Sequence, residues 1–564
     1  MLEASFELLV PLVMTAVIDT GIVNGDRGYV IRMCLVMIGL GVTGLICSVT
    51  AQYFAAKAAA GFATGVRHAL FAHIQGLSYT EMDTLGTSTM ITRMTSDVNQ
   101  TQSGVNMTLR LFLRSPFIVF GAMVMAFTIN VRAAMIFVVT IPLLSVVVFG
   151  IMLITMPLYK RVQAALDRVL GTTRENLTGV RVLRAFNKEE EERKRFSERN
   201  ETLTRMQVAA GRVSALMNPI TYVIINGAVV ALIWTGAIQV DGGIITQGEV
   251  VALVNYMSQI LVELIKLANL IITITKALAC AGRISAVLET ESSMTAPALE
   301  EWKGNGKDRM PAPAKPGTVE FRHVCLTYQN AGAESLTEVD FKAEPGQTIG
   351  IIGGTGSGKS SLVNLIPRFY DATKGSVRVD GVDVKGYPLE VLRGKIGVVP
   401  QKAVLFKGSI SDNLKWGKKD ASQEEMWEAL ELSQAREFVE KKGRGLDMRI
   451  TQGGKNLSGG QRQRLTIARA LVKKPEILIL DDSASALDFA TDAKLRQAIR
   501  GMKEKLTVFI VSQRAASIQY ADQIIVLDDG EVAGIGTHEQ LLAGCPVYQE
   551  IYYSQFPKEE CANG

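Results

Sequence analysis

The segment QTIGIIGGTGSGKSSLV (residues 347–363) determines how the second half of this chain folds. Its opening part, QTIGIIG, predicts a buried strand, and a glycine-rich turn leads from that strand into a helix. Gly353 and the run Gly358–Ser360 follow the spacing G-x-x-x-x-G-K-S. Glycines let backbone N–H groups approach a phosphate, and the helix adds the positive end of its dipole. We therefore expect a phosphate site here, with Lys359 on the β- and γ-phosphates and the Ser360 hydroxyl on Mg²⁺.

Two further motifs follow this turn. The segment EILILDD (residues 476–482) predicts a strand that delivers Asp481 to the carboxyl edge of a sheet, where Asp481 is expected to hold Mg²⁺ through water. The run Leu457–Gln461 reads LSGGQ and opens the helix RQRLTIARALV. Serine and glycine at a helix N-terminus predict either a second anion site or an ordinary helix cap, and the residues alone leave both open.

Strand-like and helical patterns alternate through the C-terminal half. Besides the strand already described, β-branched segments predict strands at TVEFRHVCLTY, GSVRVDG, KIGVVPQ, EILILDD, TVFIVSQ and QIIVLDDGEV. Such alternation predicts an α/β domain with a largely parallel sheet, which we place at residues 317–564. The proline- and glycine-containing stretch Lys303–Gly317 predicts a linker, placed at residues 291–316.

The N-terminal half carries long uncharged runs. No Asp, Glu, Lys or Arg occurs in Met33–Ala56, Ala133–Tyr159 or Val213–Val240, and each run exceeds the roughly 20 residues that a helix needs to cross a bilayer. A shorter run, Ser115–Val131, is long enough if Arg114 snorkels to the interface. With two interrupted runs added, spans are expected at about residues 5–24, 30–56, 110–131, 133–157, 214–240 and 248–275. The predicted fold is an α-helical six-span transmembrane domain (residues 1–290) followed by an α/β P-loop nucleotide-binding domain.

The charges of the connections predict an orientation in the membrane. The connections after the second and fourth spans are long and basic, whereas the other links are short and hold few charges. Because Lys and Arg are in excess in the cytoplasmic loops of membrane proteins, this distribution of charge predicts that both long connections and both chain ends are cytoplasmic. Apolar residues at three-to-four spacing predict that these connections are helical. We expect the turns near Tyr79–Gly86 and Glu175–Arg184 to dock onto nucleotide-binding domains.

Composition excludes several classes of protein. Of the 564 residues, 48% are hydrophobic and 20% are charged, which rules out a disordered or collagen-like chain. The six cysteines form no CxxC pair and are interpreted as apolar or loop residues. The net charge of +5 is spread without a dense Lys/Arg stripe, so we expect no nucleic-acid partner.

In this order, the motifs resemble the nucleotide-binding domain of an ABC transporter, and the six spans before them resemble a half-transporter of the exporter type. The matching motifs are the Walker A loop Gly353–Ser360, the Walker B strand Ile477–Asp481, the signature Leu457–Gln461, the Q-loop residue Gln401, the D-loop Ser485–Asp488 and the A-loop residue Tyr328. The resemblance implies ATP and Mg²⁺ as cofactors, with the metal on Ser360, Gln401 and Asp481. It also implies a nucleotide site made of Tyr328, Gly353, Gly354, Thr355, Gly356, Ser357, Gly358, Lys359, Ser360 and Ser361. In this family two nucleotide-binding domains form a dimer, and each ATP lies between the Walker A loop of one domain and the signature of the other. The resemblance therefore implies that Ser458, Gly460, Gln461 and Asp488 have catalytic roles at the site of the partner domain.

Three residues depart from the family's pattern. The Glu that usually follows the Walker B Asp is Asp482, the switch His is Gln513, and a Glu before the signature is Gln452. Withdrawing a carboxylate by one methylene moves it about 1 Å, which can cost about 10²-fold in rate, and Gln513 cannot carry a proton. Asp482 and Gln513 are our candidate catalytic residues of a weakened site. This pattern resembles the degenerate subunit of heterodimeric bacterial multidrug exporters, which binds ATP and lends an intact signature to its partner.

Other functions remain open at this point. A homodimeric exporter would hydrolyse ATP at both sites, and an ATP-gated channel or regulator would use the same motifs without transport. An importer is less consistent because spans and ATPase are fused, and the spans exclude a soluble ATPase. The resemblance implies a hydrophobic or amphipathic substrate moved out across the cell membrane. Glu263 and Lys266 in the sixth span are either substrate-facing groups or an exposed stabilising pair.

Overall fold

The computed structural model describes residues 1–300, 302, 316–329, 331–483, 486–502 and 506–556. It divides into two compact units. Unit 1 comprises Met1–Gln75 and Ser88–Thr290, and unit 2 comprises Gly76–Thr87 and Glu291–Gly564. Most of the expected linker, including Pro311 and Pro313, lies outside the described residues. The predicted boundaries at residues 290 and 316 stay predictions.

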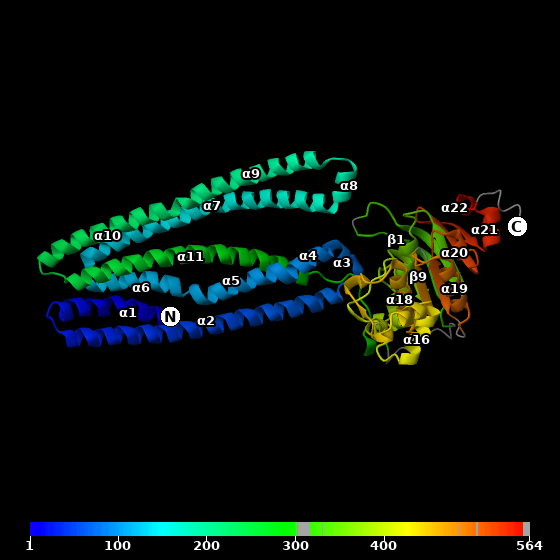
Figure 1. The fold of residues 1–564 in the computed structure, drawn as a ribbon, viewed down its shortest axis with the longest axis horizontal. Helices are drawn as coiled ribbons and strands as arrows, with labels where there is room; N and C mark the ends of the chain where they lie inside the picture. The colour runs from blue at the N-terminus through cyan, green and yellow to red at the C-terminus, as the bar shows by residue number, and fades with distance from the viewer. Residues whose placement is uncertain (301, 303–315, 330, 484–485, 503–505, 557–564) are drawn as a thin grey trace. The chain divides into compact units, whose positions relative to one another are not determined.

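Unit 1 is helical and is built mainly from long helices (Figure 1). They are α1 (Leu2–Ala16), α2 (Arg27–Gly76), α4 (Thr87–Thr92), α5 (Val98–Leu111), α6 (Arg114–Ile129), α7 (Val131–Thr178), α8 (Val180–Ala185), α9 (Glu189–Ala215), α10 (Met217–Asp241) and α11 (Gln247–Leu288), with π-helical turns η1 (Val17–Ile22) and η2 (Arg93–Asp97). In the part of the chain that the structure describes, six helical stretches are long and apolar enough to span a membrane, which confirms the expected number. They are Leu2–Ile22, Arg27–Gly76, Thr87–Ile129, Val131–Thr178, Glu189–Asp241 and Gln247–Leu288.

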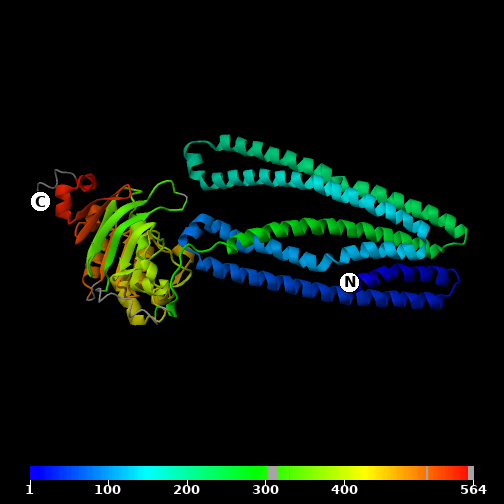
Figure 2. The ribbon, with the colours of Figure 1, turned by 180° about the vertical axis from the view of Figure 1, so that it is seen from behind.

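Helix α11 is central to the packing of unit 1. It contacts α1, α5, α6, α7 and α10, and its residues Tyr256, Met257 and Ile260 are fully buried among apolar side chains of these helices. The Tyr256 hydroxyl donates to the Leu8 carbonyl of α1 at 2.7 Å, so its one polar group is satisfied. Helices α7 and α9 run side by side in both views (Figures 1 and 2).

Arg114 forms ion pairs with carboxylates of two other helices. Its guanidinium lies 3.1 Å from Glu263 of α11 and 2.8 Å from Glu7 of α1. Glu263 is only 2% exposed and also accepts from the Ser115 hydroxyl at 2.6 Å and from Lys266 at 2.7 Å. A carboxylate this deeply buried needs several partners, because an unpaired one is costly to bury. Of the two interpretations of Glu263 and Lys266, the exposed pair is therefore wrong for Glu263, while a substrate-facing role stays a prediction.

Unit 2 is an α/β domain that also contains the short helix α3 (Tyr79–Leu85). Its strands are β1 (Val319–Leu326), β2 (Leu336–Ala343), β3 (Thr348–Gly353), β4 (Lys374–Val379), β5 (Val382–Asp383), β6 (Ile396–Val399), β7 (Gly408–Ser409), β8 (Arg449–Ile450), β9 (Ile477–Asp481), β10 (Thr507–Val511), β11 (Gln523–Asp528) and β12 (Glu531–Gly536). Its other helices are α13 (Lys359–Leu365), α14 (Leu389–Lys395), α15 (Ile410–Lys415), α16 (Gln423–Leu432), α17 (Arg436–Lys441), α18 (Gly459–Leu471), α19 (Phe489–Arg500), α20 (Ala515–Ile518), α21 (His538–Gly544) and α22 (Pro546–Gln555).

Over the described residues, the main sheet has six strands in the order β12-β11-β3-β10-β9-β6. All neighbours in it are parallel except β11 and β12, so the predicted α/β class is confirmed. Two expectations need correction. Strands β1 and β4 belong to a separate antiparallel sheet, β2-β1-β4-β5. The segment QIIVLDDGEV forms a hairpin rather than one strand, because Asp529 and Gly530 both have positive φ and reverse the chain.

Alternating residues of the main sheet build two separate cores. Ile477 and Ile479 of β9 pack in one core with the antiparallel sheet and α13. Leu478 and Leu480 pack in the other core with helices that include α16, α18 and α19. Side chains of a strand point to opposite faces in turn, so a strand buried on both faces must be apolar throughout. Because β3, β9 and β10 are parallel, their carboxyl ends lie at one edge of the sheet.

Candidate nucleotide-binding site

A pocket of about 390 Å³ lies at this carboxyl edge. It is lined by Tyr328, Ser335, Thr355, Gly356, Ser357, Gly358, Lys359, Ser360, Ser361, Gln401, Asp481, Asp482, Val511, Ser512 and Gln513. The size is within the range of small-molecule sites. Most candidates from the glycine-rich turn, the Q-loop, the Walker B strand and the switch position therefore meet in one place. Sequence reasoning missed Ser335, Val511 and Ser512, which carry no motif of their own.

The glycine-rich turn takes a shape that larger residues would not allow. Gly356 and Gly358 have φ angles of 88° and 89°, in the left-handed region that favours glycine. A Cβ atom on Gly353 would lie 2.1 Å from the Leu527 carbonyl oxygen. Gly358 is the N-cap of α13, so the turn leads directly into the positive end of that helix. The local geometry is that of a loop able to surround a phosphate.

Lys359 lies at the base of the pocket. Its ammonium donates to the carbonyl oxygens of Gly353 at 3.0 Å and Gly354 at 2.5 Å, and to the Ser357 hydroxyl at 3.3 Å. Gly353 and Gly354 thus contact the pocket through Lys359 rather than line it. Burial lowers the pKa of Lys359, and the negative charges of the two aspartates beside the strand end oppose this shift.

Ser360 and Asp481 meet as the sequence predicted. The Ser360 hydroxyl donates to an Asp481 carboxylate oxygen at 3.0 Å, and burial raises the pKa of Asp481. With the nearby Gln401 amide, the donors here are oxygens, which Mg²⁺ prefers. Among the described residues there is no cluster of three His, Cys, Asp or Glu that could hold a metal without further ligands. The donor set fits a Mg²⁺ ion that takes its remaining ligands from phosphate and water.

Two of the three departures from the family's pattern, Asp482 and Gln513, line the same pocket. Asp482 has a φ of 44°, its backbone N–H donates to the Val511 carbonyl at 3.0 Å, and its carboxylate lies 3.4 Å from the Gln401 amide nitrogen. The loop at Gln513 is fixed by Gln555 of α22. The Gln555 amide donates to the Gln513 carbonyl at 2.8 Å and accepts from the Ala515 N–H at 2.9 Å. No sequence motif indicates that Gln555 contacts the loop at Gln513.

The signature residues lie outside the pocket. Ser458 is the N-cap of α18, and its hydroxyl accepts from the Gln461 N–H at 3.3 Å. The anion site at this helix end stays a prediction. A Cβ on Gly460 would lie 3.1 Å from the Ala486 carbonyl oxygen, which places the D-loop against the signature. Asp488 caps α19 by accepting from the Thr491 N–H at 2.8 Å. Ser485 of the D-loop lies outside the described residues.

The first of the two expected docking turns lies within unit 2. Helix α3 contacts the loop after α13 through a hydrogen bond of 2.6 Å from the Tyr370 hydroxyl to Asp83. Its Tyr79 ring lies 4.9 Å from the Phe369 ring. The second expected turn, Glu175–Arg184, belongs to unit 1, and its docking stays a prediction.

Comparison with known proteins agrees with this geometry. Residues 1–264 match the model of the ABC transporter transmembrane region, and residues 336–485 match the ABC transporter model. Over 553 residues the chain is 39% identical to an uncharacterised ABC transporter ATP-binding protein of Mycobacterium tuberculosis, covering 97% of this chain and 93% of that one. It is 28% identical over 556 residues to the ATP-dependent lipid A-core flippase of Salmonella typhimurium, covering 98% and 94%. The solved structure of a bacterial Atm1-family ABC exporter with ATP bound has the same fold, with a TM-score of 0.79, 22% identity, and coverage of 99% of this chain and 97% of that one.

Proposed function

Because this chain belongs to the ABC transporter family as an exporter half-transporter, we propose that it pairs with a second, different half-transporter and that its own site hydrolyses ATP slowly. One observation carries the proposal. The pocket that keeps Lys359, Ser360 and Asp481 for binding also contains Asp482 and Gln513, where the family has Glu and His. We therefore expect this site to keep its ability to bind nucleotide and to be weakened in activating the attacking water.

The retained residues are suited to MgATP. Lys359 and the N–H groups of the glycine-rich turn would bind the phosphates, and Tyr328 would stack on adenine. Ser360, Asp481 and Gln401 would hold Mg²⁺, which would neutralise phosphate charge. The hydrogen bond of 3.0 Å between Ser360 and Asp481 supports a shared metal, because both side chains already point to one place.

The altered residues are less suited to hydrolysis. The Asp482 carboxylate stands on a side chain one methylene shorter than Glu, and a retreat of about 1 Å from the attacking water can cost about 10²-fold. Gln513 donates a hydrogen bond but cannot become positively charged beside the γ-phosphate. Its loop is fixed through Gln555, so movement of the backbone would not bring another group into its place.

The intact signature supports a partner with a competent site. Ser458 is exposed at the N-terminus of α18 and lies outside this chain's own pocket. Its hydroxyl and the N–H groups of that helix end would serve phosphate bound by another subunit. We infer that this chain completes the partner's site, and that both chain ends and the long helical connections are cytoplasmic.

The substrate we propose is a hydrophobic or amphipathic molecule carried out of the cell. Six apolar spans supply a membrane-embedded route, and a relative matched over almost its whole length is a lipid A-core flippase. The ionic network at Glu263 places charge among these helices, which supports an amphipathic rather than a purely apolar substrate.

ATPase activity separates this proposal from its alternatives. Purified alone in lipid nanodiscs, the chain is expected to bind ATP but turn it over slowly. Co-expression with a half-transporter from a neighbouring reading frame is expected to raise steady-state turnover by at least about tenfold, because a Glu-containing site then meets this chain's signature. Robust turnover by the chain alone would support the homodimeric exporter instead. ATP binding without substrate-stimulated turnover in any pair would support a regulator.

The second cytoplasmic turn should meet a nucleotide-binding domain. Val182 on α8 and the neighbouring Phe186 are 60% and 72% exposed, and an open groove of about 310 Å³ in unit 2 is lined in part by Phe406 and Trp416. Apolar groups this exposed mark contact surfaces. A photo-crosslinking residue at position 182 is therefore expected to label the segment around Phe406, in this chain or in the corresponding segment of the partner, as read by mass spectrometry. The same residue at the exposed Val208 of α9 is the control. Absence of any such product with and without ATP would contradict this docking.

A further inference from the structure

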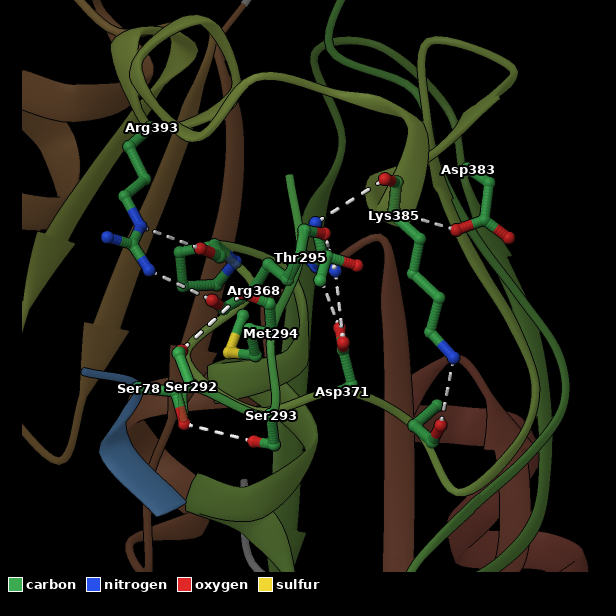
Figure 3. A network of polar contacts seen from close by, with 12 residues as sticks. Ser78, Ser292, Ser293, Met294, Thr295, Arg368, Asp371, Asp383, Lys385 and Arg393 are labelled. Carbon is green, nitrogen blue, oxygen red and sulfur yellow. Dashed lines mark hydrogen bonds and ion pairs between the residues drawn. The ribbon is translucent and has the colours of Figure 1, made fainter. Parts of the chain in front are cut away.

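Helix α3 follows α2 directly in the chain and is held firmly within unit 2. Its N-cap Ser78 and Glu81 form a capping box. Glu81 also accepts from the Ser293 N–H at 3.2 Å, and the Ser78 and Ser293 hydroxyls lie 3.2 Å apart (Figure 3). One end of α3 is thus fixed to the segment that leads out of α11. The C-terminal end of α3 makes a different set of contacts.

The C-terminal end of α3 contacts Gln329 and Tyr370, two residues next to Tyr328. We call Tyr328, the residue proposed to stack on adenine, the adenine platform. The Thr84 hydroxyl donates to the side-chain oxygen of Gln329 at 3.1 Å, and Gln329 is the next residue after Tyr328. The Tyr370 hydroxyl donates to Asp83 at 2.6 Å. The Tyr370 ring in turn meets the Tyr328 ring edge-on, with centroids 5.0 Å apart and planes at 88°. Edge-to-face contact of this kind fixes the orientation of both rings.

The loop that carries Tyr370 is itself rigid. Arg368 is only 2% exposed, and its guanidinium donates to Asp371 at 2.7 and 3.0 Å and to the Thr295 carbonyl at 2.9 Å. Arg393 donates to the Arg368 carbonyl at 3.0 Å (Figure 3). Tyr370 lies between Arg368 and Asp371, so its backbone cannot shift without breaking buried charged hydrogen bonds.

Tyr328 is held from its other side by the nucleotide site. Its hydroxyl donates to the Ser361 hydroxyl of α13 at 2.9 Å. Burial raises the pKa of Tyr370, and the adjacent Asp83 carboxylate raises it further, so this hydroxyl stays protonated and remains a donor to Asp83. A continuous line of contacts therefore runs from α3 through Tyr370 to Tyr328 and α13.

We propose that Asp83 and Tyr370 are positioning residues that hold the Tyr328 ring for the purine base, so that α3 sets how much the base contributes to nucleotide affinity. The proposal rests on the proposed function, in that ATP is the ligand of this pocket. Coupling of this kind is reciprocal: if the base fixes Tyr328 and thereby α3, then a change in α3 must alter affinity for the base. The phosphate end of the site, around Lys359, should be unaffected.

The experiment measures the base and the phosphates separately. The full chain, with its partner in nanodiscs, is photolabelled with 8-azido-ATP, and the label on this chain is displaced by ATP or by inorganic tripolyphosphate. The ratio of the two affinities reports the contribution of the nucleoside. Tyr370→Phe and Asp83→Ala are expected to lower this ratio by roughly three- to tenfold, within the range of a base stacked on an aromatic ring. The affinity for tripolyphosphate should stay within about twofold.

Matched variants distinguish positioning from a general loss of structure. Tyr387→Phe removes a buried hydroxyl of the same domain, bonded to the Val379 carbonyl at 3.0 Å, and should leave the ratio unchanged. Asp83→Asn keeps an acceptor oxygen and should restore most of the ratio lost in Asp83→Ala. Tyr328→Ala should give the lowest ratio, and adding Tyr370→Phe to it should lower the ratio no further.

Failure of the inference and failure of the proposed function differ. If Tyr328→Ala lowers the ratio and Tyr370→Phe does not, Tyr370 does not position the platform. If Tyr328→Ala has no effect, the platform itself is wrong, and the inference falls while ATP binding stands. If tripolyphosphate affinity falls as much as ATP affinity, the variants act on the fold and the inference is overturned. If neither competitor displaces the label from the unaltered chain, the pocket is not an ATP site.

Discussion

Replacing Lys359 by alanine is expected to abolish ATP binding at this chain's site, raising the Kd by about 10²-fold or more. Among the described residues that line the pocket, Lys359 is the only Lys or Arg, and Asp481 and Asp482 are its only carboxylates. Without the ammonium, the triphosphate would face two aspartates with no opposing side-chain charge. Each charge-assisted hydrogen bond is worth about 1.5–3 kcal/mol, so the loss exceeds what the loop N–H groups can offset.

Photolabelling or calorimetry on the full-length chain measures this effect directly. Lys415→Ala, on the exposed surface of α15, removes the same charge elsewhere in the domain and should leave the Kd unchanged. Thermal unfolding without nucleotide shows whether Lys359→Ala still folds, because Lys359 also bonds the carbonyls of Gly353 and Gly354. Unchanged nucleotide affinity in a folded Lys359→Ala variant would overturn the assignment of the pocket.

The parts of the fold that are local in sequence could be predicted. The strand, turn and helix around Gly353–Ser360 depend on glycines at left-handed φ and on a helix start, both of which are visible in the residues themselves. The six spans depend on the absence of charge over about 20 residues. Which strands pair with each other was harder to predict from the sequence. Val319–Leu326 was predicted as a strand beside those of the main sheet, but it pairs antiparallel with β2 and β4, and local residue pattern does not specify the partner of a strand.

Contacts between distant residues account for most of what the sequence could not predict. The sequence did not indicate the partner of Arg114, which pairs with Glu263, 149 residues away. Gln555 reaches the loop at Gln513 from the C-terminal helix, and a single Gln there carries no motif. The meeting of Ser360 and Asp481 was predictable, because parallel strands present their carboxyl ends at one edge.

Steady-state ATPase of three variants in the same heterodimer tests the assignment of two unequal sites. Ser458→Arg is expected to reduce turnover by at least about tenfold, because a long side chain at the N-terminus of α18 would fill the space meant for the partner's γ-phosphate and misplace it by more than about 1 Å. Asp482→Ala should reduce turnover far less, since that carboxylate belongs to the site that is already slow. Asp482→Glu should raise the rate only in part, because Gln513 still limits the same site.

The contrast between the first two variants is more decisive than either rate. Both residues are outside the apolar cores, and Ser458 is exposed while Asp482 is half-buried, so general unfolding does not account for a difference between them. Ser458→Ala serves as the matched control, because it removes the hydroxyl and its cap to Gln461 without adding bulk. If Asp482→Ala proves as damaging as Ser458→Arg, this chain's own site does most of the hydrolysis, and both the degenerate site and the need for a different partner are refuted together.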